Sequence, residues 1–288
     1  MRISRAKVGE LEIYGICDAR PAQVDPTRSY PDVPREAWAP HRRWLTEDGQ
    51  FQPDLGCFVV RSPDGVALID AGIGPGPVSY LGGARGTLRD SFGELGLAFD
   101  DVTAVIFTHL HFDHVGWAST ADMKGVMRPS FPNARYFVGA TEWAFWDRGP
   151  TNVMAHHIDA FARIVRPVAT EGLLTVVADG SSPIEGFVYR CLPGNTPGHQ
   201  GVLATSGGQR CLFCADICHC PVQVAEPSWS HRSDVDADAG RATRAAIFSA
   251  FADTDALLAF GHFPRGSDLG HVARGDDGWA WRPLGTGN

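Results

Sequence analysis

The chain has 288 residues, and its 25 Lys and Arg against 33 Asp and Glu give a formal net charge of −8. The hydrophobic fraction of 44% is typical of a folded globular protein and excludes a disordered chain. The acidic balance argues against a nucleic-acid partner, and no apolar run reaches the roughly 20 residues of a membrane-spanning helix. The amino terminus lacks the apolar core of a signal peptide, so we expect a cytoplasmic protein without membrane contact.

The seven cysteines are an odd number in a chain that is too long for a disulfide scaffold, so we expect reduced thiols. Cys211 and Cys214 form a CxxC pair, which in other settings is redox-active or binds zinc. They lie in the segment RCLFCA, which is typical of a buried strand, and the second half of a four-cysteine site is missing. We therefore interpret both as buried structural cysteines.

The predicted elements alternate short strands with helices, and we expect an α/β protein in which residues 1–288 form a single domain. Residues 20–56 are rich in Pro, Trp and Arg without a period, which indicates an ordered amino-terminal arm or lid that roofs a pocket or packs against a twin subunit. A Ser-Pro-Asp-Gly turn predicts a hairpin of 57–61 and 66–70. A helix at 85–97 and a strand at 102–108, covered on both faces, come next. We expect further strands at 135–138, 174–178, 187–192, 202–205, 210–215 and 257–260, helices at 141–146, 155–165 and 240–252, and a closing hairpin of 271–274 with 279–282.

One strand–turn–strand pattern occurs twice along the chain. Residues 59–70 end in Asp70, and residues 203–216 repeat the plan and end in Asp216. Downstream of each, an apolar strand is followed by a histidine, His109 in one case and His262 in the other. Two similar halves that face each other would bring these strand tips to one edge, although hairpins also recur in α/β chains without duplication.

The segment THLHFDHVG at 108–116 places three histidines and an aspartate directly after a predicted strand. Residues two apart in extended backbone point the same way, so His109 and His111 can hold one cation together. Asp113 and His114 follow as the chain turns toward a helix, and present a carboxylate and an imidazole to a neighbouring position. Imidazole with carboxylate suits zinc or another first-row cation, so the segment predicts a metal site.

Three more candidate ligands stand at later strand tips: His199 in Thr-Pro-Gly-His, Asp216 in Phe-Cys-Ala-Asp, and His262 in Phe-Gly-His-Phe. The ordered set HxHxDH, His, Asp, His resembles the metallo-β-lactamase superfamily from about residue 55 to the carboxy terminus. The resemblance implies a four-layer αβ/βα sandwich with the metal site at one edge of two facing sheets. It implies that one metal is bound by His109, His111 and His199, the other by Asp113, His114 and His262, with Asp216 bridging both. Asp70 matches the early Asp-x-Gly position and would orient the ligand loop, the alternative being a simple turn cap.

The implied cofactors are two divalent ions, with zinc as the expected metal and iron, manganese or cobalt as alternatives. Two such ions sharing a water generate hydroxide near neutral pH, which attacks an electrophilic carbon or phosphorus. Asp113, with one oxygen on the metal and one free, could orient the hydroxide and later return a proton. We therefore expect a hydrolase without an organic cofactor.

Two branches of the superfamily resemble this chain. The string TH-x-H-F-D-H-x-G resembles quorum-quenching lactonases that open acyl-homoserine lactones, whereas the residues around 216–223, 262–264 and 270–271 look like the branch of methyl parathion hydrolase. His219 stands where the lactonases place a Tyr, and it is either a substrate hydrogen-bond donor and proton shuttle or an ordinary loop histidine. The expected reaction is opening of a lactone or other carboxylic ester; the alternatives are a phosphotriester hydrolase and a non-catalytic metal-holding scaffold or sensor.

The expected partner is a small neutral ester, lactone or phosphotriester, and a homodimer stays open. Five aromatic residues would form an apolar pocket for a neutral group, although core positions are the favoured alternative: Trp117, Trp143, Phe145, Trp146 and Phe161. His156 and His157 begin a predicted helix, and we favour a solvated helix end over substrate contact. The remaining histidines without a partner pattern are interpreted as structural or surface residues: His41, His231 and His271.

Overall fold

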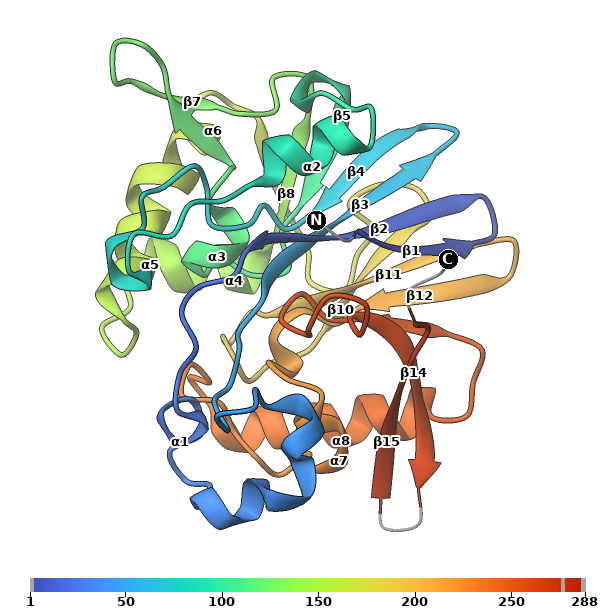
Figure 1. Ribbon diagram of the computed structural model, residues 1–288. Coiled ribbons are helices and arrows are strands. Elements are labelled where there is room, and N and C mark those ends of the chain that lie inside the picture. Colours follow the sequence, from blue (N-terminus) through green and yellow to red (C-terminus); the bar gives the residue numbers. More distant parts are fainter. Residues whose placement is uncertain (1–2, 276–277, 286–288) are drawn as a thin grey trace.

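Two β-sheets lie at the centre of the molecule in the computed structural model, which describes residues 3–275 and 278–285 (Figure 1). The first sheet has seven strands in the order β1-β2-β3-β4-β5-β8-β9, antiparallel up to β4 and parallel from β4 onward. Their bounds are Ser4–Val8, Leu11–Ala19, Leu55–Ser62, Gly65–Ile69, Val102–Ile106, Arg135–Gly139 and Leu174–Val177.

The second sheet has six strands in the sequential order β10 to β15, and only the β12–β13 pair is parallel in the described part of the chain. These strands are Phe187–Cys191, Gln200–Ser206, Gln209–Phe213, Leu257–Ala259, Leu269–Gly275 and Gly278–Pro283. The closing hairpin is confirmed, although its turn residues 276 and 277 lie outside the described residues. A small separate hairpin consists of β6 (Ser119–Ala121) and β7 (Met127–Pro129).

Helices cover the outer face of each sheet (Figure 1). The α-helices α1 to α8 are Pro26–Ser29, Leu88–Glu94, Phe112–Val115, Ala140–Asp147, Ala155–Ala160, Arg166–Thr170, Val222–Ala225 and Ala237–Phe251. Short 3-10 helices occur at η1 (Arg35–Trp44), η2 (Ser79–Leu81), η3 (Phe99–Asp101) and η5 (Ala215–Ile217), and η4 (Phe161–Val165) is a π-helical turn that continues α5. Within residues 3–275 and 278–285, every helix is too short or too polar to cross a lipid bilayer.

The alternation of side chains along the strands produces four layers. In β4, Ile69 faces the second sheet and Leu68 faces the helices outside the first sheet. In β12, Phe213 faces the first sheet and Leu212 faces the helices outside the second. Successive residues of a strand point to opposite faces, so a strand covered on both sides is apolar throughout. The four-layer sandwich predicted from the sequence is therefore confirmed.

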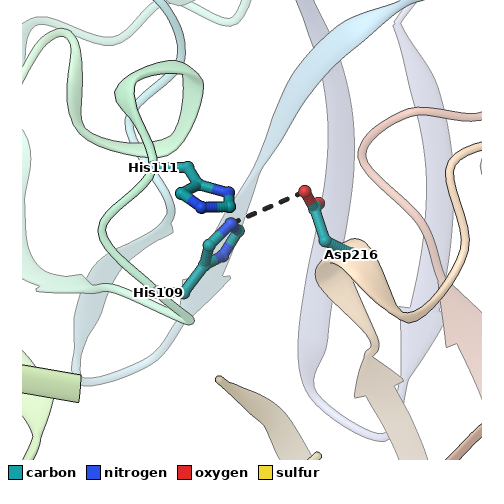
Figure 2. A group of neighbouring side chains, drawn as sticks. All are labelled: His109, His111 and Asp216. Atoms are coloured by element: carbon teal, nitrogen blue, oxygen red, sulfur yellow. Dashed lines mark ion pairs between the residues drawn. The ribbon is translucent and has the colours of Figure 1, made fainter. Parts of the chain in front are cut away.

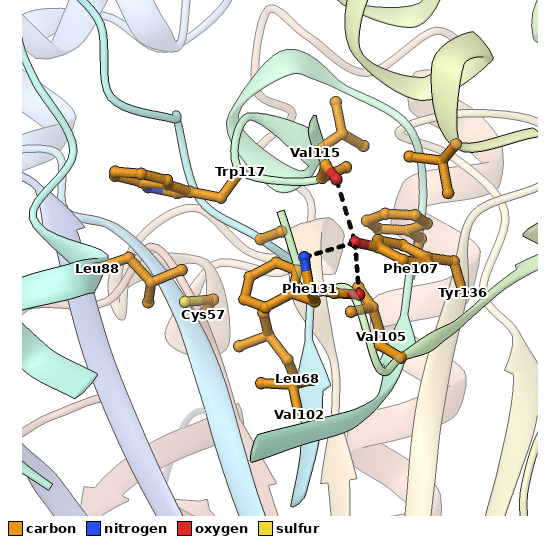
Figure 3. Close-up of a cluster of buried hydrophobic side chains, with 14 of the residues drawn as sticks. Cys57, Leu68, Leu88, Val102, Val105, Phe107, Val115, Trp117, Phe131 and Tyr136 are labelled. Atoms are coloured by element: carbon orange, nitrogen blue, oxygen red, sulfur yellow. Dashed lines mark hydrogen bonds between the residues drawn. The ribbon is translucent and has the colours of Figure 1, made fainter. Parts of the chain in front are cut away.

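The apolar core between the first sheet and its covering helices contains the buried Tyr136 (Figure 3). Its hydroxyl is hydrogen-bonded to the chain that follows the histidine-rich segment. Tyr136 Oη accepts a hydrogen bond from the backbone N–H of Phe131 at 3.0 Å and donates one to the carbonyl of Ala118 at 3.1 Å. Trp117 packs in the same cluster, edge-on to Phe99 at a ring-centroid distance of 5.5 Å. This packing fixes the end of the loop that carries the candidate ligands.

The two halves predicted from the repeated pattern share one topology. In the first, β3 pairs antiparallel with β4, and β4 pairs parallel with β5. In the second, β11 pairs antiparallel with β12, and β12 pairs parallel with β13. Asp70 follows β4 and Asp216 lies three residues after β12, so both aspartates stand at the same kind of strand tip.

The structure adds two features that the sequence did not predict as strands, the β1–β2 hairpin and the small β6–β7 hairpin. The arm at 20–56 contains the short helices α1 and η1 rather than continuous loop. Tyr30, Trp38 and Phe51 of this arm form a separate apolar cluster with Cys220 and Val222, so the arm is anchored to the chain that follows Asp216. All seven cysteines are free thiols, and Cys211 and Cys214 are buried, as predicted.

Candidate metal centre

The histidine-rich segment leaves β5 at Ile106 and turns into α3 at Phe112. His109 and His111 lie in the connecting loop, whereas Asp113 and His114 lie in the first turns of α3, as the sequence predicted. All four side chains are buried. Figure 2 shows His109 and His111 turned toward Asp216 across the space between the two halves of the chain.

Asp216 is the residue on which the cluster converges. It is 3% exposed and lies in η5, directly after β12. Its Oδ1 lies 3.1 Å from His114 Nε2 and 3.0 Å from His262 Nε2, and its Oδ2 lies 3.5 Å from His109 Nε2. Because these histidines come from both halves, one carboxylate joins the two strand edges.

Two groups of side chains each have their ligand atoms within 4.8 Å of one another. One group is His109, His111 and Asp216, and the other is Asp113, His114 and His262. His199 stands beside the first group, with its ring centroid 4.9 Å from that of His109. Its Nε2 accepts a hydrogen bond from the backbone N–H of Asp216 at 3.1 Å, and a cation at this nitrogen would have to replace that bond.

Three of the histidines have their Nδ1 atoms held by oxygen acceptors outside the cluster. The distances are 2.8 Å from His114 to Asp70 Oδ2, 2.9 Å from His199 to the Leu192 carbonyl and 2.8 Å from His262 to the Asp54 carbonyl. An acceptor at Nδ1 places the proton there and leaves the Nε2 lone pair free. This arrangement of the second ring nitrogen is typical of metal-binding histidines.

Burial sets the protonation of the first group. It lowers the pKa of His109 and His111 well below the ordinary value, and lowers that of His199 to about 4, so these imidazoles are neutral. Burial alone would raise the pKa of Asp216, but the surrounding histidines, with His114 foremost, hold it well below its ordinary value. The first three imidazoles therefore offer free lone pairs beside an ionised carboxylate. Burial alone would lower the pKa of His114 and His262, but the Asp216 carboxylate raises the first well above its ordinary value and the second to about 9, so a cation at these two nitrogens would displace a proton.

Several of these atoms are buried without a hydrogen bond, although buried polar groups rarely are. Among the described residues they include Nε2 of His109, His114 and His262 and Oδ1 of Asp216. Each unsatisfied buried polar atom costs about 1–3 kcal/mol. Divalent cations bound by nitrogen and oxygen would satisfy all four at once, so the residues present fit a pair of metal ions.

Asp70 joins the loop to the cluster. Its Oδ1 accepts a hydrogen bond from the Thr108 backbone N–H, and its Oδ2 accepts from the Thr108 hydroxyl and lies against His114 Nδ1, each at 2.8 Å. We expect Asp70→Asn to lower metal affinity by about 10- to 100-fold, because an amide N–H₂ at the Oδ2 position cannot accept from His114. Chelator competition against the purified holoprotein measures this. The exposed Asp90→Asn is the control, and an unchanged affinity in Asp70→Asn would leave Asp70 as a turn cap only.

A cavity of about 450 Å³ opens onto the cluster, and Asp113, Asp216 and His262 contribute to its lining. The arm supplies Val24, Phe51 and Leu55 to the wall, so the arm borders this space. A position over a pocket was one of the two alternatives predicted for the arm, and packing against a twin subunit was the other. Other apolar lining residues come from η2, α3 and the chain before α5: Tyr80, Leu81, Phe112 and Met154.

His219 lies at the cluster rather than in an ordinary loop environment. Its Nε2 is 3.2 Å from Asp216 Oδ2 and 3.2 Å from the Ser233 hydroxyl. Its ring stacks between those of His262, at 5.1 Å, and His231, at 3.8 Å. Asp216, His219 and His262 also form a third group with ligand atoms within 4.8 Å, so His219 could serve as a ligand as well as a proton carrier.

Two interpretations of histidines from the sequence were wrong. His157 is not at a solvated helix end: it is 3% exposed, lines the cavity and stacks on His111 at a centroid distance of 3.9 Å. His231 also lines the cavity and contacts His219. His41 and His271 lie elsewhere, against Glu226 and the Ala256 carbonyl, as expected of structural residues.

The five predicted pocket aromatics do not line the cavity. All five belong to the core on the outer face of the first sheet, which was the favoured alternative: Trp117, Trp143, Phe145, Trp146 and Phe161. The aromatic wall comes instead from isolated residues such as Phe51 and Tyr80, which stand in segments without a regular period. No local pattern marks such positions, so they could not be predicted from the sequence.

Glu142 is a further residue that the sequence did not single out. It is 0% exposed, and its Oε1 accepts hydrogen bonds from the Leu110 backbone N–H at 2.9 Å and Trp146 Nε1 at 2.6 Å. Its Oε2 accepts from the Thr196 hydroxyl at 2.6 Å. Leu110 lies between His109 and His111, and Thr196 precedes His199 by three residues. One carboxylate thus fixes the loop that carries His109 and His111 and the loop that carries His199.

Comparison with solved structures places this architecture among known folds. Hydrolase AbOPH of the beta lactamase superfamily is similar with a TM-score of 0.86 and 24% identity, over 100% of this chain and 99% of that one. AidC, a dizinc quorum-quenching lactonase solved with a product, is similar with a TM-score of 0.83 and 23% identity, over 99% of this chain and 98% of that one. An N-acyl homoserine lactone hydrolase solved with N-hexanoyl-L-homoserine at its metal centre gives a TM-score of 0.61 at 17% identity, over 91% of this chain and 94% of that one.

Sequence comparison gives shorter matches. The metallo-hydrolase mfmC of Annulohypoxylon moriforme is 31% identical over 142 residues, and the match covers 44% of this chain and 34% of that protein. The probable metallo-hydrolase Mb2322c of Mycobacterium bovis is 26% identical over 190 residues, and the match covers 55% of this chain and 55% of that protein. The chain thus spans about a third to a half of the length of these curated relatives.

The sequence profile of the Metallo-beta-lactamase superfamily matches residues 57–262. This range begins in β3 and ends at His262, so it contains Asp70 and all seven candidate ligands. The match covers more than half of the 288 residues, and the fold agrees with it. The chain therefore belongs to the metallo-beta-lactamase superfamily.

Proposed function

We propose that this protein is a dinuclear metal-dependent hydrolase that opens a lactone or another carboxylic ester. The observation that carries the proposal is the buried cluster in which Asp216 contacts histidines of both ligand groups at 3.0–3.5 Å. A degenerate, non-catalytic relative would lack part of this set, whereas this chain has all seven candidates, and four of them line the cavity: His111, Asp113, Asp216 and His262.

In this proposal His109, His111 and His199 hold one divalent ion, Asp113, His114 and His262 hold the second, and Asp216 bridges them. Zinc suits this mixture of imidazole and carboxylate, and iron, manganese or cobalt are alternatives. When bound, the two ions supply Lewis acidity and an activated water at neutral pH. Asp113 lines the cavity, where its carboxylate would be placed to take up and return the proton of the attacking water.

The choice of a carboxylic ester rests on three points. Two of the similar solved structures are a quorum-quenching lactonase, AidC, and an N-acyl homoserine lactone hydrolase. The TH-x-H-F-D-H-x-G string of this chain resembles that branch. The cavity of about 450 Å³ has the size of a small-molecule site, with an apolar wall next to the candidate metal centre.

The test uses purified protein loaded with zinc, assayed for metal by elemental analysis and for turnover of a chromogenic lactone, an aryl ester and a phosphotriester. We expect two ions per chain and preferred hydrolysis of the lactone or the ester. Preference for the phosphotriester would replace this substrate class with the methyl parathion hydrolase type. Two bound ions with negligible turnover of all three classes would identify a metal-holding scaffold and overturn the proposal.

His219 is proposed as a proton carrier at the cavity. Its ring lies between Asp216 and the Ser233 hydroxyl and lines the space where substrate would bind. We expect His219→Ala to retain two ions while kcat falls by about 10²-fold, as is typical when a general acid or base is removed. Elemental analysis and steady-state kinetics measure the two effects. His271→Ala serves as the control, and loss of an ion from His219→Ala would make His219 a ligand instead.

The cytoplasmic location and a homodimer remain predictions. Seven free thiols are what a reducing compartment would maintain, and this supports the location.

A further inference from the structure

Two arginines border the cavity on the side away from the core. Arg28 comes from α1 in the arm, and Arg232 comes from the chain before α8. Both are exposed, and both line the cavity that contains Asp113 and Asp216. The backbone N–H of Arg232 donates a hydrogen bond to the Ser29 carbonyl at 2.9 Å, so the two arginine-bearing segments are tied together at this point.

Neither guanidinium has an acidic partner. Within residues 3–275 and 278–285, the side chains of Arg28 and Arg232 make no hydrogen bond or ion pair. Two other arginines of the arm do have acidic partners, Arg35 with Asp25 and Arg20 with Asp54. In a chain with a net charge of −8, two unpaired arginines on one cavity wall form a local excess of positive charge.

The lining of the cavity therefore contains both negatively and positively charged side chains. The two lining carboxylates, Asp113 and Asp216, belong to the buried metal cluster, and the two arginines stand where the cavity meets solvent. The same lining contains apolar residues, which include Tyr80 and Phe51. Burial lowers the pKa of His156, which lines the same cavity; the Asp113 carboxylate opposes this shift and the charge of Arg232 adds to it, as expected of residues in one lining.

We propose that Arg28 and Arg232 bind an anionic group of the substrate that is remote from the bond being cleaved. This inference rests on the proposed hydrolase function and narrows its substrate class, from the neutral ester that the sequence predicted to an ester or lactone with an oxyanion at its far end. A guanidinium presents a planar fork of N–H donors that matches a carboxylate, which is the oxyanion we select for the test. The apolar wall accommodates the carbon chain that joins the two ends.

The experiment compares two aryl esters of equal chain length on the zinc-loaded enzyme. One is 4-nitrophenyl hexanoate, and the other is 4-nitrophenyl hydrogen adipate, in which a carboxylate replaces the terminal methyl group. We expect kcat/KM to favour the adipate ester by roughly tenfold, as for a charge-assisted contact that is partly exposed to water. The double variant Arg28→Gln with Arg232→Gln brings the ratio close to one, and 0.5 M salt reduces it in the wild type because solvent screens exposed charges.

The control is Arg43→Gln, which removes an exposed arginine of the same arm that does not line the cavity, and it leaves the ratio unchanged. Equal turnover of both esters in the wild type, or a preference that survives in the double variant, would overturn the inference. If neither ester is hydrolysed, the proposed function fails for carboxylic esters. The role of the arginines is then decided by calorimetry, which compares the binding of adipate with the binding of hexanoate. Tighter adipate binding that the double variant abolishes supports the inference, and equal binding refutes it.

Discussion

Asp216→Ala is expected to remove both metal ions and to lower kcat/KM by about 10³-fold or more, since the reaction depends on both ions. The reason is geometric: the Asp216 carboxylate lies 3.0 Å from His262 Nε2, 3.1 Å from His114 Nε2 and 3.5 Å from His109 Nε2. These nitrogens belong to both ligand groups, so one substitution weakens both positions. Elemental analysis and turnover of the preferred ester measure the two losses together.

The control for Asp216→Ala is His271→Ala, because His271 contacts the Ala256 carbonyl and lies outside the cluster. It should keep two ions and full activity. An Asp216→Ala protein that retained both ions and normal turnover would show that Asp216 does not bridge them. Loss of one ion only would assign Asp216 to a single position.

Glu142→Ala is expected to lower the free energy of unfolding by about 4 kcal/mol, because three buried donors lose their acceptor at about 1–3 kcal/mol each. The donors are the Leu110 backbone N–H, Trp146 Nε1 and the Thr196 hydroxyl. Metal affinity should fall as well, because Leu110 lies in the loop of His109 and His111 and Thr196 lies in the loop of His199. Chemical denaturation and chelator competition measure the two effects.

Glu142→Gln is the matched variant, and its pH dependence separates charge from shape. Burial raises the pKa of Glu142 from 4.5 to about 7. The folded protein therefore holds this proton more tightly than the unfolded chain, and the stability that Glu142 contributes decreases as pH rises from about 4.5 to about 7. Gln resembles the protonated acid and does not titrate, so the variant should lack this part of the pH dependence. An identical pH profile in both proteins would mean that folding does not shift the pKa of Glu142.

The metal cluster was the part of the molecule most accessible from sequence. His109, His111, Asp113 and His114 follow one apolar strand within six residues, and this spacing alone indicates that they gather at the end of that strand. The placement of Asp216 and His262 was also foreseen, because both follow strands of the repeated hairpin pattern. Short-range spacing and strand topology are sufficient for such positions.

The cavity wall could not be predicted in the same way. Trp143 and Trp146 have helical spacing near the metal loop, but that spacing reflects the face buried against the first sheet. His157 was misjudged because a His pair at a helix start is compatible with solvent, and only the tertiary contact with His111 buries it. Long-range contacts between segments without periodicity decide which residues line a cavity, and no local pattern encodes them.

The arm ties substrate selection to metal retention through Asp54. The Asp54 carbonyl lies 2.8 Å from His262 Nδ1, while its carboxylate is paired with Arg20 and accepts the Arg265 backbone N–H. The same arm supplies Arg28 and Phe51 to the cavity. Grafting this segment from a relative to redirect the enzyme would therefore disturb the orientation of His262 at the same time. Engineers who wish to change one property independently should keep Arg20 together with residues 52–56 and vary only the part of the arm that lies between them.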